Sequence, residues 1–176
     1  MTRRLALWVP LGVFALFVGV VLYGLLWPRS TVIESRLVGQ PVPAFVLPGL
    51  DEGRPGLATA DLRGGKPVLL NIFASWCLPC AAEAPQLMAL KRAGVTIHAV
   101  AVRDRPEDIA RFFAQYGDPY AHVGLDDRSR VQMAIGSSGV PESFIVDGRG
   151  VIRHQHVGDI RAEDVPDLLK RLEAAR

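Results

Sequence analysis

The clearest fold signal in this chain is the run Val68-Leu-Leu-Asn-Ile-Phe-Ala-Ser-Trp-Cys-Leu-Pro-Cys80. Its first six residues, Val68–Phe73, are almost entirely apolar, which is typical of a strand covered on both faces of a sheet. The cysteines then open a segment, Cys77–Lys91, that has apolar residues at helical spacing and Gly94 just past its end. The stretch therefore predicts a buried strand that leads directly into a helix carrying a Cys-x-x-Cys pair.

The sequence after this stretch continues to alternate between strand and helix signals. Thr96–Val102 predicts a second strand, and Asp104-Arg-Pro106 opens a helix that runs through Tyr116. Arg128–Ile135 indicates an extra helical turn. The last part predicts two strands joined by a Gly148-Arg-Gly150 hairpin and then a helix: Ser143–Asp147, Val151–Val157 and Ala162–Ala174. The order βαβα followed by ββα predicts an α/β fold with a mixed central sheet flanked by helices.

The N-terminal part of the chain has a different character. Leu5–Trp27 contains no Asp, Glu, Lys or Arg, and its 23 residues are long enough to cross a bilayer as a helix. A cleaved signal peptide is the alternative, but the apolar stretch is longer than usual and no A-x-A-like cleavage site follows it. We expect residues 1–28 to be a membrane anchor, 29–38 a linker and 39–176 one domain. Arg3 and Arg4 predict a cytoplasmic N-terminus, and hence an exported domain.

Composition excludes one class of function. The chain has 20 basic and 18 acidic residues and a formal net charge of +2, with no basic block. It therefore lacks the electrostatic footprint of a nucleic-acid-binding protein.

The chemistry of the chain depends on its only two cysteines, Cys77 and Cys80. The unpaired N–H groups and the dipole at a helix N-terminus stabilise a thiolate, and thiol pKa values in such sites fall to roughly 3.5–7.5. We expect Cys77 to be the exposed nucleophile and Cys80 the buried resolving thiol. A zinc site would need four ligands, and His154 and His156 have no predicted proximity to the pair. A structural disulfide would close a very small loop and stabilise little. We expect no metal and no cofactor beyond the redox-active disulfide.

Several motifs carry a resemblance to a known family. Leu70–Cys80 is similar to the active-site segment of membrane-anchored thioredoxin-like proteins. Gly139-Val-Pro-Glu-Ser-Phe-Ile-Val-Asp147 resembles the loop and strand of one branch, the cytochrome c biogenesis thiol:disulfide interchange proteins (CcmG/DsbE). Leu37–Phe45 resembles the strand that this family adds before the thioredoxin core, and Asp118-Pro-Tyr120 the stretch ahead of its inserted segment. The likeness extends from the anchor to the last helix.

The resemblance implies a function. Such proteins receive electrons from a membrane thiol transporter and pass them to the Cys-x-x-Cys-His motif of apocytochrome c, or to a haem-ligation factor. It implies a thioredoxin-like fold, a periplasmic domain anchored in the bacterial inner membrane, and a thiol-disulfide oxidoreductase. Leu78-Pro79 between the cysteines does not mark this branch, and Ala81 and Ala82 stand where some members carry a basic residue. The alternatives are a general periplasmic thioredoxin-like reductase and a non-enzymatic apocytochrome-binding module.

The same resemblance implies which residues bind substrate or tune the thiols. Pro79 lies between the cysteines, and Trp76, directly before Cys77, either flanks the site or is a core aromatic. Val140-Pro141 is either an ordinary loop bond or, as the resemblance implies, a cis bond beside the cysteines. Glu83 and Glu142 are each either a solvated surface charge or an acid near the dithiol. If Glu142 lies beside the dithiol, its charge opposes the Cys77 thiolate and raises the pKa of that thiol. His98 and His122 have no predicted role.

Overall fold

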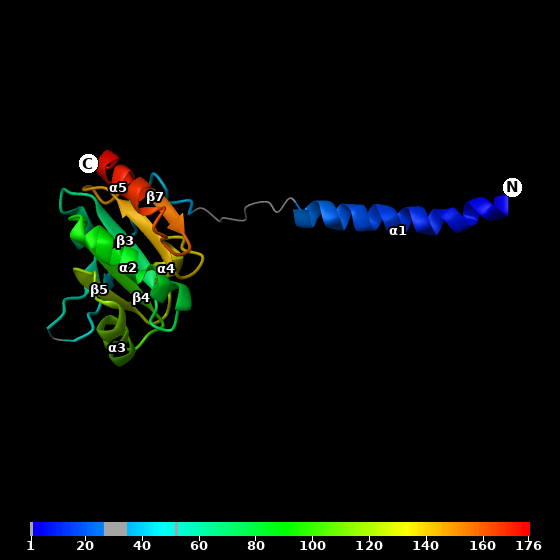
Figure 1. The fold of residues 1–176 in the computed structure, drawn as a ribbon. Coiled ribbons are helices and arrows are strands. Elements are labelled where there is room, and N and C mark those ends of the chain that lie inside the picture. Colours follow the sequence, from blue (N-terminus) through cyan, green and yellow to red (C-terminus); the bar gives the residue numbers. More distant parts are fainter. Residues whose placement is uncertain (1, 27–34, 52) are drawn as a thin grey trace. The chain divides into compact units, whose positions relative to one another are not determined.

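The computed structural model describes residues 2–26, 35–51 and 53–176, with side chains from Trp8 onward. The chain divides into two units, residues 1–32 and 33–176. The first contains helix α1 (Thr2–Leu26), drawn in blue in Figure 1. Its part from Trp8 to Leu26 is long and apolar enough to cross a membrane.

The second unit is built on a five-stranded mixed sheet with the strand order β5-β4-β3-β6-β7. β3 (Val68–Phe73) is central and pairs in parallel with β4 (Ile97–Val102), which pairs in parallel with β5 (His122–Asp126). On its other side β3 pairs antiparallel with β6 (Glu142–Val146), and β6 with β7 (Ile152–Val157). The buried run of β3 is covered on both faces, as its apolar sequence predicts.

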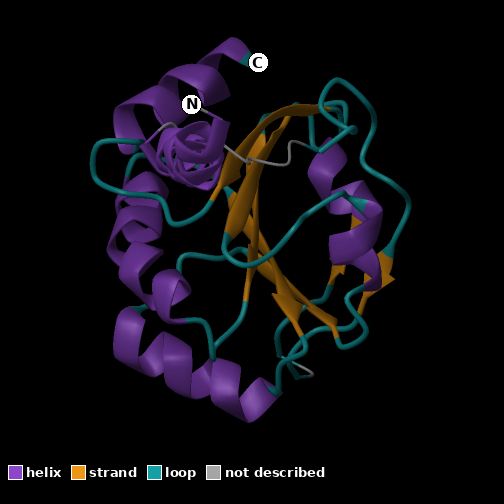
Figure 2. Ribbon diagram, turned by 90° about the vertical axis from the view of Figure 1, so that its right-hand side faces the viewer, coloured by secondary structure: helices purple, strands orange, loops and turns teal. Residues whose placement is uncertain are grey.

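Helices cover both faces of this sheet, which Figure 2 shows nearly edge-on. One face, which we call the dithiol face, packs against α2 (Leu78–Arg92), α3 (Pro106–Tyr116) and α5 (Val165–Ala174). The other, the N-terminal face, is covered by residues 35–45, the 3-10 helix η1 (Thr59–Arg63) and α4 (Arg130–Ala134). Each face has its own cluster of buried apolar side chains, so the domain has two cores separated by the sheet.

The predicted mixed sheet with flanking helices is confirmed, and the predicted elements end within a few residues of the observed ones. Three strands are missing from the prediction: β5, at the edge of the five-stranded sheet, and two short strands outside that sheet. A short ribbon of these two, β1 (Val46–Leu47) and β2 (Leu57–Ala58), lies against β5. Gly124 of β5 lies so close to this ribbon that a Cβ atom there would come within 2.7 Å of Leu47. The glycine marks a close packing contact.

The prediction of a strand at Leu37–Phe45 is wrong. Residues 36–39 form a turn, and only Pro41 makes an isolated bridge, to Val151. Pro41 and Pro43 have no N–H groups, so a continuous ladder cannot form here. Residues 29–34 of the expected linker, 29–38, lie outside the described residues. The remainder of this linker packs on the domain: Ser35 is buried, and its hydroxyl donates a 2.7 Å hydrogen bond to the Ile135 carbonyl.

Candidate functional site

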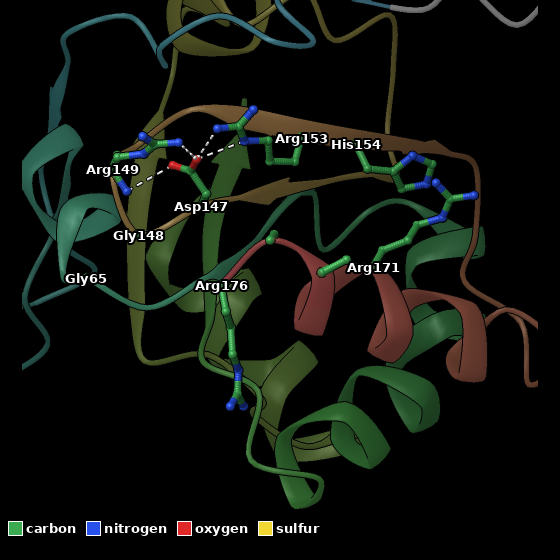
Figure 3. Close-up of a pocket in the computed structure, with 10 residues that line it drawn as sticks. Gly65, Asp147, Gly148, Arg149, Arg153, His154, Arg171 and Arg176 are labelled. Carbon is green, nitrogen blue, oxygen red and sulfur yellow. Dashed lines mark hydrogen bonds and ion pairs between the residues drawn. The ribbon is translucent and has the colours of Figure 1, made fainter.

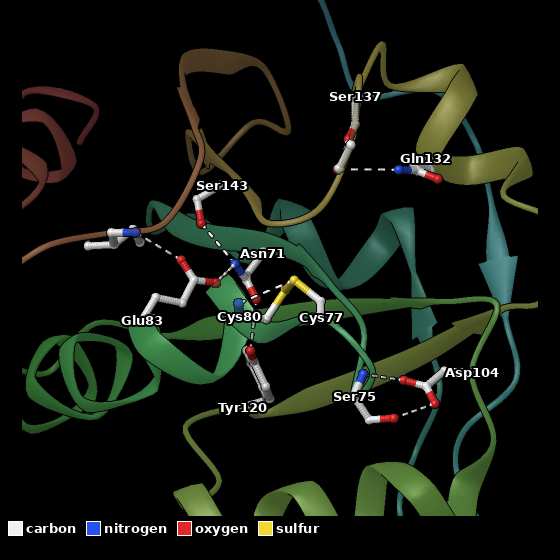
Figure 4. Close-up of a disulfide and its surroundings, with 12 residues drawn as sticks. Asn71, Ser75, Cys77, Cys80, Glu83, Asp104, Tyr120, Gln132, Ser137 and Ser143 are labelled. Atoms are coloured by element: carbon white, nitrogen blue, oxygen red, sulfur yellow. Dashed lines mark hydrogen bonds between the residues drawn. A yellow bond between two sulfur atoms is a disulfide. The ribbon is translucent and has the colours of Figure 1, made fainter.

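The two cysteines form a disulfide at the start of α2, just beyond the end of the central strand β3 (Figure 4). Cys77 is the N-cap of α2, and its Sγ accepts a 3.2 Å hydrogen bond from the Cys80 amide. This donor is one of the otherwise unpaired N–H groups of the first helical turn. Both residues are buried, with 5% of Cys77 and 2% of Cys80 exposed, so the expected exposure of Cys77 is wrong for the disulfide-bonded form. The helix terminus thus places a donor where negative charge develops when the Cys77 thiolate forms.

The loop before Cys77 is held by the segment that follows β4. The buried carboxylate of Asp104 accepts hydrogen bonds from the Ser75 amide and hydroxyl and from the Arg105 amide. The indole Nε1 of Trp76 donates to the Arg103 carbonyl at 3.2 Å, while the side chain stays 62% exposed. Trp76 therefore lies at the surface beside the disulfide and is not a core residue.

A buried polar network lies on the dithiol face, and it centres on Asn71 of β3 (Figure 4). Asn71 Nδ2 donates to Glu83 Oε1 and to Ser143 Oγ, each at 3.0 Å. Its Oδ1 accepts from the Tyr120 hydroxyl at 2.8 Å. The second oxygen of Glu83 accepts from the Ile160 amide at 3.0 Å. All the polar side-chain atoms of Asn71, Glu83 and Tyr120 have partners, as buried groups require.

Glu83 is the titratable group of this network nearest to Cys80 along α2. It is 1% exposed, and burial raises its pKa from 4.5 to about 7, against the opposing hydrogen bonds from the Ile160 amide and Asn71. Residues three apart in a helix lie on the same side, so Glu83 is one turn beyond Cys80. Burial also raises the pKa of the Tyr120 phenol, which therefore keeps its proton. Near neutral pH, Glu83 can both accept and release a proton.

Glu142 is equally buried but lies on the N-terminal face. Glu142 and Phe144 are two residues apart on β6 and therefore point to the same face, where Phe144 belongs to the core. Ser143, between them, points to the other face and to Asn71. The Glu142 carboxylate accepts from the Ser138 amide and hydroxyl and, at 3.1 Å, from Gln155 Nε2. Gln155 Oε1 in turn accepts from the Ser35 amide. The surface-charge alternative is therefore wrong for both glutamates, and Glu142 faces away from the Asn71 network.

The Val140–Pro141 bond is cis, as expected, and this loop leads into β6. Val140 is partly buried against both cores. Gln132 and Ser137 both donate to the Gly139 carbonyl and hold the loop in place (Figure 4). Next to the cysteines, Pro79 is exposed and Leu78 is 81% exposed.

The sequence analysis missed the other side chains of the Asn71 network and the contact that holds the cysteine loop: Asn71, Tyr120, Ser143, Ser75 and Asp104. One signal could have found the first of them. Asn71 is the single polar residue in the apolar run of β3, and a polar side chain buried in a central strand must have partners. The other four are brought together only by the pairing of distant strands.

A mixed sheet with a Cys-x-x-Cys pair at the N-terminus of the helix after its central strand defines the class of thioredoxin-like thiol-disulfide oxidoreductases. The family model described as Redoxin matches residues 37–172 of this chain. A thiol:disulfide interchange protein DsbE of Pseudomonas fluorescens is 38% identical over 158 residues, covering 90% of this chain and 87% of the relative. HelX of Rhodobacter capsulatus, a thiol:disulfide interchange protein, is 38% identical over 159 residues, covering 90% and 89%.

The solved structures agree with these sequence matches. A crystal structure of a thiol:disulfide interchange protein DsbE from Chlorobium tepidum has a TM-score of 0.64 and 30% identity, and the match covers 78% of this chain and 96% of that one. The chain belongs to the Redoxin family and, within it, to the DsbE-type thiol:disulfide interchange proteins.

Proposed function

We propose that the protein is a membrane-anchored periplasmic reductase that reduces the disulfide of apocytochrome c, or of a haem-ligation factor, during cytochrome c maturation. The observation that carries the proposal is the Cys77–Cys80 disulfide at the N-terminus of α2, in a chain that matches DsbE-type proteins over most of its length. A reductant is needed in this compartment because haem is attached to reduced thiols, whereas the periplasm is kept oxidising.

The reaction is a two-electron exchange. The Cys77 thiolate attacks one sulfur of the substrate disulfide, forms a mixed disulfide and releases the first substrate thiolate. Cys80 then loses its proton and attacks Cys77 Sγ, which releases the second thiolate and leaves the disulfide seen in the structure. The substrate gains two electrons and two protons. A membrane thiol transporter supplies the electrons that reduce Cys77–Cys80 again.

Glu83 is the group that we assign to the proton of Cys80. Cys80 is buried, so its proton cannot pass directly to bulk water. Glu83 lies one turn away on the same helix, and its pKa of about 7 suits an acceptor that works near neutral pH. The Asn71 and Ile160 hydrogen bonds fix the position of its carboxylate.

The surface around the dithiol supports a macromolecular substrate. Trp76 and Leu78 project from the loop and the first turn of α2, and exposed aromatic and aliphatic side chains are typical anchors of protein interfaces. Together with Pro79 and the partly buried Val140 they form the surface that we assign to substrate binding, and Pro141, which is buried, is assigned to shaping the loop behind it. The apolar span Trp8–Leu26 of α1 supports the anchor, and Arg3 and Arg4 in the first turn of this helix support a cytoplasmic N-terminus.

The test is a trap for mixed disulfides. In Cys80→Ser the second step cannot occur, so the partner stays bound to Cys77, and we expect apocytochrome c or a haem-ligation factor to be captured. Cys77→Ser with Cys80→Ser is the matched control, which should capture nothing and should not support cytochrome c assembly. Capture of unrelated periplasmic proteins alone would favour the general reductase. Cytochrome c assembly with the double variant would favour the binding module.

A further inference from the structure

A second concave site lies at the end of the sheet opposite the dithiol. Gly65 precedes β3, and its amide donates a 3.1 Å hydrogen bond to the Gly148 carbonyl in the β6–β7 turn. The six residues of β3, about 20 Å of strand, separate this turn from the cysteines. A cavity of about 670 Å³ opens here between the turn, β7 and the end of α5.

The lining of this cavity is strongly basic (Figure 3). Its charged side chains are those of Asp147, Arg149, Arg153, Arg171 and Arg176, with His154 beside them. On α5, Asp167 pairs with Arg171, and Glu173 pairs with Arg176 just past the end of the helix. Arg63 and Lys66 add positive charge from the segment before β3. The whole chain is nearly neutral, so this end of the domain concentrates positive charge.

The carboxylate in the lining, that of Asp147, is already fully engaged. It accepts hydrogen bonds from the Arg149 and Val151 amides, and from Arg153 Nε at 2.8 Å. Burial alone would raise its pKa, but these bonds and Arg153 hold it below the ordinary value, so it stays ionised and fixes Arg153. Arg149 is 3.6 Å from the same oxygen and its side chain is 80% exposed, so its guanidinium is available to a ligand.

We propose that this cavity binds the phosphate headgroup of an anionic phospholipid. Guanidinium groups match phosphate oxygens with paired hydrogen bonds. Arg149 and Arg153 come from the β6–β7 hairpin and Arg171 from α5, and all three line one concavity. We favour a lipid as the source of the phosphate group because eight residues separate Leu26, in the apolar helix, from Ser35. If the helix is embedded in a membrane, this short linker keeps the domain close to the lipid headgroups. This step rests on the anchor assigned above. Headgroup binding at this end would leave the dithiol end open to protein substrates.

The experiment uses the full chain in nanodiscs of phosphatidylcholine, or of phosphatidylcholine with a minority of phosphatidylglycerol. Hydrogen exchange of residues 147–154 and 171–176 should slow only in the anionic discs, and added salt should reverse the effect. Arg149→Gln with Arg171→Gln should lose this protection. The pair spares Arg153 and its bond to Asp147, and Arg111→Gln with Arg130→Gln, on α3 and α4, removes two exposed charges elsewhere as the matched control.

The outcomes separate the proposal from its rivals. Equal exchange in the two kinds of disc, or protection that survives Arg149→Gln with Arg171→Gln, overturns it. The same protection from inorganic phosphate added to neutral discs also overturns it, because the ligand would then be the free anion. If the anchor assignment itself is wrong, carbonate will release the protein from both kinds of disc, whatever their lipid, which distinguishes this outcome from the others.

Discussion

Glu83 and Glu142 are buried to the same extent, 1% exposed each, yet they lie on opposite faces of one sheet and serve different neighbours. Glu83 shares α2 with Cys80 and accepts two hydrogen bonds, from Asn71 and Ile160. Glu142 accepts three, which connect the loop at Ser138 with Gln155 and thereby with Ser35. A buried carboxylate near a redox pair in the sequence is thus not necessarily one that acts on it. The face of the sheet decides whether it can.

The largest expected difference between the two glutamates is in catalysis. Glu83→Gln removes the proton acceptor that we assign to Cys80, and such groups contribute about 10²–10⁴-fold to rates. We expect resolution of the mixed disulfide to slow about a hundredfold at pH 7, with the attack by Cys77 little changed. Rapid-quench measurement of a preformed mixed disulfide gives this rate directly. Glu142→Gln is the control and should keep the wild-type rate; equal slowing of both variants would remove the distinction.

The second difference is in stability against pH. The pKa of Glu83 is about 7 in the folded protein against 4.5 when unfolded, so its contribution is fully present below pH 4.5 and is lost as pH rises to about 7. Keeping this group buried and charged costs about 3 kcal/mol at pH 8. Glu83→Gln should recover part of that. The amide of Asn71 can turn over and still pair with the substituted side chain, with Ser143 and with Tyr120, but the Tyr120 hydroxyl then accepts and its proton loses its acceptor.

His98, on the N-terminal face, has the opposite dependence and must be separated from this effect. Burial and the neighbouring His122 lower its pKa to about 4, so its contribution is present above pH 6.5 and is lost as pH falls toward 4. The free energy of unfolding should therefore be compared between Glu83→Gln and the wild type at each pH, since His98 is common to both. A difference that does not grow between pH 4.5 and 7 would contradict the buried-acid assignment.

The third difference is also in stability, but Glu142→Gln should lower the free energy of unfolding, whereas Glu83→Gln should raise it. Glu142→Gln places an amide N–H₂ against the Ser138 or the Gln155 donors, and Gln155 cannot turn over because its Oε1 accepts from the Ser35 amide. One donor, of Gln155 or of the exposed Ser138, loses its acceptor, which should lower the free energy of unfolding by about 1 kcal/mol. Urea denaturation measures this. The equilibrium of the dithiol with glutathione should not move, and a tenfold shift would show that Glu142 acts on the thiols after all.

The fold was largely predictable because its main elements carry strong local patterns. β3, α2 and the Gly148-Arg-Gly150 hairpin follow from apolar runs, helical spacing and turn residues. β5 could not be found this way, because Gly124 interrupts a five-residue strand and is required only by the ribbon packed against it. β1 and β2 have two residues each, which is too short for any periodicity.

The candidate site was predictable as far as its chemistry is local. The cysteine pair, the helix start and the loop with Pro141 follow from residues close together in the chain. The surroundings of the two glutamates do not, because they depend on which face each strand residue occupies and on partners such as Asn71 and Gln155, 12 and 13 residues away. Strand register settles that question, and a shift of one residue would exchange the two faces.

The smallest expected effect is the coupling between the two glutamates. Mutations at independent sites usually add within about 0.5 kcal/mol, and Glu83 and Glu142 share no hydrogen-bond partner among the described residues. The one connection between them is the chain itself, where Ser143, a partner of Asn71, follows Glu142. The free energy of unfolding of Glu83→Gln with Glu142→Gln should thus equal the sum of the single changes. Gln155→Leu with Glu142→Gln is the positive control, because those side chains are bonded and should couple. A coupling above about 1 kcal/mol between the glutamates would mean that β6 transmits strain across the sheet, and that the loop at Pro141 and the proton acceptor are adjusted together.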